Sequence, residues 1–181
     1  MKRILMSMGI VLLVMAFAGS ALAGPIGLDQ WYRFQFGSTG TFATSSPVSG
    51  SNYVGADTPA WTITTSVDTL LTVTDAWIRG DEFEIFDFGS SIGSTPVVAD
   101  PGSLGTETED PEVAILDPTY SWASFLLGAG TYSFTIKVTD SPYGSGAGFF
   151  RVASVPEPSS LLLLGTGLLG LAGFRRKFRR S

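Results

Sequence analysis

The chain is predicted to be an all-β protein with a single antiparallel β-sandwich, jelly-roll-like or Ig-like. Hydrophobic residues recur with a period of two over short stretches, as expected for strands with one buried face. Clusters rich in Gly, Pro, Ser and Asp separate these stretches at short spacing. Away from the termini, no stretch keeps a helical period for four turns. The pattern predicts the fold class but leaves the strand order open.

The most regular strand is predicted at residues 131–139, where Tyr132, Phe134, Ile136 and Val138 share one face. Further strands are predicted at residues 30–36, 61–65, 70–78, 83–88, 95–99, 113–116, 120–127 and 148–153. Turns are predicted at residues 39–52, 79–81, 89–93, 100–110 and 141–146. In the last strand, the adjacent rings of Phe149 and Phe150 should point to opposite faces.

The first 23 residues are typical of a secretory signal peptide. Lys2 and Arg3 form a basic start, residues 4–17 are apolar, and Ala21 and Ala23 fit the small-residue positions of a cleavage site. We therefore expect a mature protein that begins at Gly24. An uncleaved N-terminal anchor is the alternative, although the apolar stretch is short for a membrane span.

The last 27 residues, 155–181, form a segment of three parts. A rigid Pro-containing strip at residues 155–158 precedes an uncharged, apolar stretch at residues 159–174. As a helix, that stretch would be roughly 24 Å long, slightly shorter than the roughly 30 Å hydrocarbon core of a bilayer. A basic tail follows at residues 175–181, with the cations Arg175, Arg176, Lys177, Arg179 and Arg180. These cations predict a membrane span whose C-terminal end is cytoplasmic, with the preceding chain outside.

The order Pro156-Glu157-Pro158, apolar span and terminal Arg cluster resembles the PEP-CTERM sorting-signal family. The resemblance implies recognition by an exosortase-type enzyme in the inner membrane of a Gram-negative bacterium that makes extracellular polysaccharide. It further implies a membrane-anchored precursor, removal of the tail, and delivery to the cell surface or the extracellular space. An ordinary C-terminal anchor is the alternative. Residues 70–151 also resemble, more loosely, bodies that precede this tail in other secreted members, and no catalytic residues follow from that resemblance.

The segment between the two signals, residues 24–154, is the size of one domain. Up to Pro158 the mature body keeps four cations against all 16 carboxylates, a formal charge of −12. Such a surface repels nucleic acid, so we exclude nucleic acid as a partner. The chain contains neither Cys nor His. The sequence therefore offers no disulfide, no zinc site of the usual kind and no catalytic His.

Two acidic stretches are weak candidates for a calcium site, because Ca²⁺ takes six to eight oxygen ligands. Their candidate ligands are Asp81, Asp87, Glu107, Glu109, Asp110, Glu112 and Asp117. Neither stretch has EF-hand spacing, and surface carboxylates are usually solvated. We expect no other cofactor.

Three classes of function compete. The favoured one is an exported, non-catalytic protein of the cell surface or extracellular matrix, associated with exopolysaccharide or biofilm. The second is a calcium- or glycan-binding module, in which a tryptophan could stack on a sugar ring; the four tryptophans are Trp31, Trp61, Trp77 and Trp122. The third is a carbohydrate-active enzyme using the neighbouring carboxylates Glu82 and Glu84. Such pairs usually come from different strands, so we expect no catalytic residues.

Overall fold

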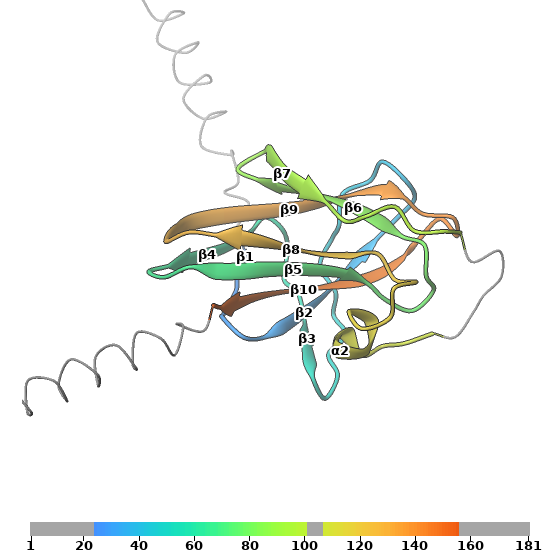
Figure 1. The fold of residues 1–181 in the computed structure, drawn as a ribbon, viewed down its shortest axis with the longest axis horizontal. Helices are drawn as coiled ribbons and strands as arrows, with labels where there is room; N and C mark the ends of the chain where they lie inside the picture. The colour runs from blue at the N-terminus through green and yellow to red at the C-terminus, as the bar shows by residue number, and fades with distance from the viewer. Residues whose placement is uncertain (1–23, 101–106, 156–181) are drawn as a thin grey trace, which may run out of the picture.

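The computed structural model describes residues 24–100 and 107–155, which form two five-stranded sheets packed face to face (Figure 1). The first sheet has the order β1-β4-β9-β6-β7. Its strands are β1 (Gly24–Pro25), β4 (Trp61–Thr65), β9 (Gly130–Asp140), β6 (Glu82–Asp87) and β7 (Ser90–Ser94). The second sheet has the order β3-β2-β10-β5-β8. Its strands are β3 (Tyr53–Gly55), β2 (Trp31–Phe36), β10 (Gly146–Ser154), β5 (Thr69–Asp75) and β8 (Trp122–Leu127).

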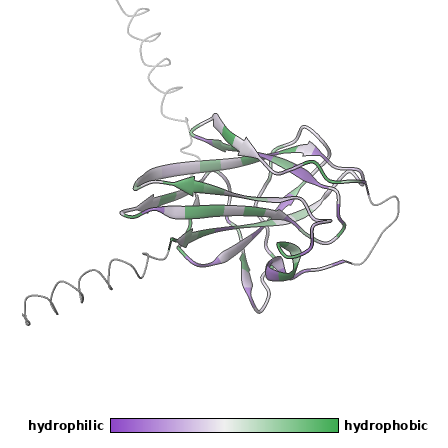
Figure 2. Ribbon diagram, in the orientation of Figure 1, coloured by the Kyte–Doolittle hydropathy of each residue, from purple (hydrophilic) through white to green (hydrophobic). Residues whose placement is uncertain are grey.

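The main core lies between the two sheets and is rich in aromatic rings. Its largest fully buried side chains include Trp61, Phe34, Phe83, Phe134 and Phe150. The ring of Phe34 meets that of Phe83 edge to face, with 5.4 Å between their centroids. Along β5, Leu71 and Val73 enter the main core and alternate with Thr72 and Thr74, and Figure 2 shows hydrophobic and polar segments along this strand. This alternation allows one face of the second sheet to enter the core while the other remains available for a second layer.

The all-β class and seven of the predicted strands are confirmed. The predicted period in β9 is also confirmed, since Phe134, Ile136 and Val138 are buried and Tyr132 packs against them. The adjacent rings at the end of the chain separate as expected. Phe150 enters the main core, whereas Phe149 belongs to a cluster on the outer face of the second sheet.

The prediction of purely antiparallel sheets is wrong, because both sheets are mixed. Strand β1 runs parallel to β4, and β2 runs parallel to β3. The chain between β2 and β3, residues 37–52, is long enough to return before pairing, which a parallel neighbour requires. Strands β1 and β3 were not predicted, since two or three residues are too few to show a period.

Two predicted strands are wrong. The segment 95–99 is not a strand, although Thr95 N donates to Phe83 O of β6 at 2.8 Å. A left-handed pair at Phe88 and Gly89 turns the chain earlier, so that the strand paired with this edge of β6 is β7. The segment 113–116 overlaps a single helical turn, α2 (Pro111–Ala114). Asp110 caps this turn by accepting the Glu112 N–H, and Pro at the first helical position favours the same conformation.

The predicted signal peptide (residues 1–23), apolar span (159–174) and basic tail lie outside the described residues. So do the sorting-motif residues Pro156, Glu157 and Pro158 and the cleavage-site residues Ala21 and Ala23. In the described part of the chain, no helix is long and apolar enough to cross a membrane.

Candidate functional site

A second hydrophobic layer covers part of the outer face of the β3-β2-β10-β5-β8 sheet. It consists of Trp31, Tyr53, Ala76 and Phe149, with Trp77 and Ile115 packed against them, and we call it the outer cluster. The outward residues of β2 and β10 supply Trp31 and Phe149. The turn after β5 supplies Ala76 and Trp77, and the residue that follows α2 supplies Ile115. The outer cluster therefore joins the sheet to α2 and to the chain around it.

Trp77 is held in an unusual backbone conformation within this layer. Its φ of 61° lies in the left-handed region, which bulky residues rarely adopt. Its N–H donates to Thr108 O at 2.8 Å, and its carbonyl accepts from Tyr120 Oη at 3.0 Å. The Arg33 guanidinium carbon lies 4.4 Å from the centroid of the indole ring. These contacts fix the direction of the indole although its backbone is strained, and such strain is typical of functional sites.

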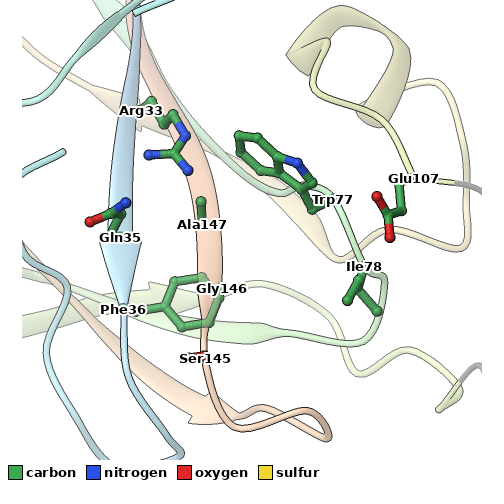
Figure 3. A pocket seen from close by; sticks show the side chains of 9 residues that line it. All are labelled: Arg33, Gln35, Phe36, Trp77, Ile78, Glu107, Ser145, Gly146 and Ala147. Atoms are coloured by element: carbon green, nitrogen blue, oxygen red, sulfur yellow. The ribbon is translucent and has the colours of Figure 1, made fainter. Parts of the chain in front are cut away.

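Beside Trp77 lies an open pocket of about 430 Å³, which we call the Trp77 pocket. Figure 3 shows Trp77 and Glu107 on one side and Arg33 and Gln35 on the other. Between them lies β10, whose small residues at this point leave space above the sheet. The remaining lining residues are Phe36, Ile78, Ser145, Gly146 and Ala147. The pocket thus combines aromatic side chains with a few polar groups, as ligand-binding pockets commonly do.

Two smaller hollows follow the Trp77 pocket, each sharing lining residues with the one before it. Glu107 lines both the Trp77 pocket and a hollow of about 350 Å³. Residues 50–53 line that hollow and a third one of about 320 Å³. In the third hollow, Glu112 accepts from Trp31 Nε1 at 2.8 Å and from Arg151 at 2.5 Å. The three hollows follow one another over the outer face of the sheet.

The charge around these hollows is mainly negative. Glu107, Glu109 and Asp110 line the second hollow. Arg33 is 7% exposed, and burial lowers the pKa of its guanidinium. In the third hollow, Arg151 is paired with Glu112. The lining therefore suits a neutral ligand better than an anionic one.

A pair of buried carboxyl groups lies where β5 ends and β6 begins. Asp75, fully buried, accepts from the backbone N–H groups of Ala76, Gly80 and Asp81 at 2.6, 3.0 and 3.2 Å. These bonds hold the loop that carries Trp77. Burial raises the pKa of Asp75 well above its usual range, and the neighbouring Asp81 raises it further.

Burial likewise raises the pKa of the Asp81 carboxyl to about 6. Asp75 and Ser141 limit this rise, and Asp140 adds to it. Asp81 is 4% exposed, and its Oδ1 atom has no hydrogen-bond partner. The pair is closed to solvent, which leaves no access for a substrate.

The acidic residues predicted as calcium candidates do not all gather at one site. Asp81 is buried in the carboxyl pair, Asp87 accepts from Ser133 N at 2.8 Å, and Asp117 caps a turn by accepting from Thr119. Hydrogen bonds from Thr119 lower the pKa of Asp117. Glu107, Glu109 and Asp110 line the second hollow, and Glu112 pairs with Arg151. The described ranges contain no group of three or more acidic residues that could hold a metal ion.

The remaining sequence candidates do not line the Trp77 pocket. Trp61 is fully buried in the main core, Trp31 belongs to the outer cluster, and Trp122 is 37% exposed on β8. Glu82 is buried and accepts from Val98 N at 3.1 Å. The sequence analysis names Trp77 but not Arg33 and Gln35. These two residues alternate along β2 with residues that enter the core, and this alternation indicates that they lie on the opposite face of the sheet.

The C-terminal segment is identified by comparison with known families. Residues 154–177 match the PEP-CTERM protein-sorting motif. The chain carries a PEP-CTERM sorting signal. The PEP-CTERM match begins at Ser154, the last residue of β10, and supports export through exosortase-type sorting.

Comparison of the whole chain adds one solved structure. The chain is similar to the pre-peptidase C-terminal domain of collagenase from Bacillus anthracis. The two share 11% identity with a TM-score of 0.35, and the similarity covers 72% of this chain and 93% of that domain. No curated protein matches the chain.

Proposed function

We propose that this protein is an exported, non-catalytic component of the cell surface or extracellular matrix, and that its sandwich associates with extracellular polysaccharide. In this proposal, an inner-membrane exosortase recognises residues 156–158 of an anchored precursor and removes the tail. The mature protein then acts through the Trp77 pocket. The PEP-CTERM motif supports the route of export.

The observation that carries the binding function is the Trp77 pocket itself. The Trp77 backbone has a strained φ, and it is held by hydrogen bonds with the Thr108 carbonyl and the Tyr120 hydroxyl. These bonds keep the indole in place. A rigid indole loses little conformational freedom when a sugar ring stacks on it. Gln35 and Glu107 offer groups that can hydrogen-bond to sugar hydroxyls. The acidic residues of the adjoining second hollow favour a neutral polysaccharide over one rich in uronic acids.

A non-catalytic role agrees with how the carboxyl groups are placed. Glycosidases set two carboxyl groups on opposite sides of the bond that they cleave, in contact with substrate. Here one carboxyl group, that of Glu107, is among the residues that line the Trp77 pocket. Asp75 and Asp81 are sealed beneath the surface, and Glu82 accepts from Val98 N. We therefore propose binding without turnover.

Affinity electrophoresis tests the proposal, with the exopolysaccharide of the producing bacterium, a neutral glucan and a polyuronate in separate gels. We expect retardation by neutral polysaccharide and a loss of about tenfold in affinity for Trp77→Ala, the effect of roughly 1.4 kcal/mol of stacking. Trp122→Ala is the matched control, because this half-exposed tryptophan does not line the pocket. Equal retardation of the Trp77→Ala variant and the parent would disprove the binding site. Release of reducing ends would disprove the non-catalytic role.

A further inference from the structure

The sorting tail leaves the folded domain from a point that is tied to the sheet. Ser154 N donates to Asp29 Oδ1 at 3.3 Å, and Val155 N donates to Asp68 O at 3.1 Å. Ser154 is also in register with Thr69 of β5. The chain is therefore part of the folded sandwich up to Val155.

Only three residues separate Val155 from the apolar stretch that begins at Ser159. Four Cα-to-Cα steps of at most ~3.6 Å each span about 14 Å when fully extended. The headgroup region of one leaflet is itself about 5–8 Å thick. If the stretch 159–174 spans the membrane, this end of the sandwich cannot move away from the lipid surface. Strand β9, with 11 residues and thus a length of about 35 Å, places the opposite end far from it.

The end from which the tail leaves also exposes apolar side chains. Figure 1 shows the end of β10 beside the turn between β4 and β5 and the turn between β8 and β9. In the first of these turns, Val67 is 47% exposed, and near the end of β8, Leu126 is 68% exposed. Leu126 is in register with Leu70, and Leu70 with Ala153, so an apolar row crosses the outer face of the sheet at this end.

The charges at this end agree with a lipid surface that is mostly zwitterionic. Asp29 and Asp68 lie beside the exit point, and they oppose strong attraction to anionic lipid. Arg151, three residues before Ser154, is paired with Glu112. Contact with lipid must therefore come from the apolar groups and from the short connection to the span.

We infer that, before the tail is removed, this end of the sandwich rests on the outer lipid surface of the membrane, with Val67 and Leu126 against the headgroup layer. The inference rests on the proposed membrane-anchored precursor and adds an orientation. The strands stand upright on the bilayer, and the processing enzyme meets its motif between the lipid and a folded domain.

Depth-dependent fluorescence quenching tests this orientation in the full-length chain. Because the sequence has no cysteine, Val67→Cys, Leu126→Cys and Val97→Cys each give one attachment site for an environment-sensitive dye. Val97 is the matched control, because it is 84% exposed and lies at the opposite end of the sandwich. Its neighbour Val98 donates to Glu82, and Glu82 is in register with Asp140 at the far end of β9. A fourth variant, Leu168→Cys, reports on insertion of the tail. The chains are reconstituted in vesicles of phosphatidylethanolamine with a minor share of phosphatidylglycerol and a nitroxide-labelled lipid.

We expect strong quenching at position 168, and quenching at positions 67 and 126 that is several-fold stronger than at position 97. Quenching at position 168, with positions 67 and 126 no more quenched than position 97, would overturn the orientation and leave the anchored precursor standing. Absence of quenching at position 168 would overturn the anchored precursor and the orientation with it.

Discussion

Replacing the buried carboxyl of Asp81 by an amide should stabilise the domain at neutral pH and leave its stability unchanged in mild acid. Burial raises the pKa of Asp81 from an ordinary value of 3.8 to about 6. Between these two values the folded protein holds a proton that the unfolded chain has lost. The contribution of this group to the free energy of unfolding is therefore complete below about pH 4, falls as pH rises, and is lost above about pH 6.

The size of this effect follows from the shift in pKa. Two pKa units correspond to about 3 kcal/mol at most, and relaxation around the charged carboxyl will reduce this to about 1–3 kcal/mol. Asp81→Asn removes the ionisation and keeps the shape. At pH 7.5 it should raise the free energy of unfolding by that amount, or the melting temperature by about 5–10 °C for a domain of this size.

The assay is urea unfolding of the domain, residues 24–155, followed by circular dichroism from pH 4 to pH 8. We expect the curves of the parent and the Asp81→Asn variant to converge near pH 4 and to separate above pH 6. Asp57→Asn is the matched control, because Asp57 is an exposed aspartate. If the variant loses stability between pH 4 and pH 7 as steeply as the parent does, Asp81 does not carry the buried proton.

Two further predictions concern close packing and the sorting signal. Gly148→Ala should destabilise the domain by about 2 kcal/mol, because its Cβ would lie 2.5 Å from the Phe34 ring and 2.9 Å from Thr74 O. Gly128→Ala, with no atom within 4 Å of the added Cβ, is its control, and equal urea midpoints would contradict the packing argument. Glu157→Ala should block processing, so that full-length protein accumulates in the inner membrane, because Glu157 is the only charge in the sorting motif. Deleting residues 175–180 should instead loosen membrane orientation, and immunoblots of membrane and medium separate the two effects. Normal release of the Glu157→Ala variant would show an ordinary anchor.

The parts of the fold that could be predicted are strands whose own hydrophobic pattern indicates which side chains are buried. Strand β9 lies inside its sheet between β4 and β6, so alternate side chains along its buried half enter the core and the period is regular. Both termini carry local signals of the same kind, in charge, small residues and an apolar stretch, and the PEP-CTERM match confirms the sorting motif at the C-terminal end.

The errors arose where a few residues outweigh the hydrophobic pattern. The sequence Asp110-Pro111 caps and starts a helical turn in a segment whose Val113, Ile115 and Leu116 otherwise resemble a strand. Phe88 and Gly89 turn the chain into β7 before the hydrophobic residues at Val97 and Val98 are reached. A hydrophobic period reports burial, and it does not report where the chain turns.

The candidate site was harder to predict because distant segments create it. Trp77 adopts its orientation because Asp75 binds three backbone N–H groups around the loop, and because Thr108 and Tyr120 hold the Trp77 backbone from another segment. Asp75 is not among the residues that the sequence singles out, and only its burial shows that it shapes the pocket wall. Asp75 therefore has two opposing effects. Its ionisation lowers the stability of the fold, and its hydrogen bonds hold Trp77 in a backbone conformation that the chain would otherwise avoid.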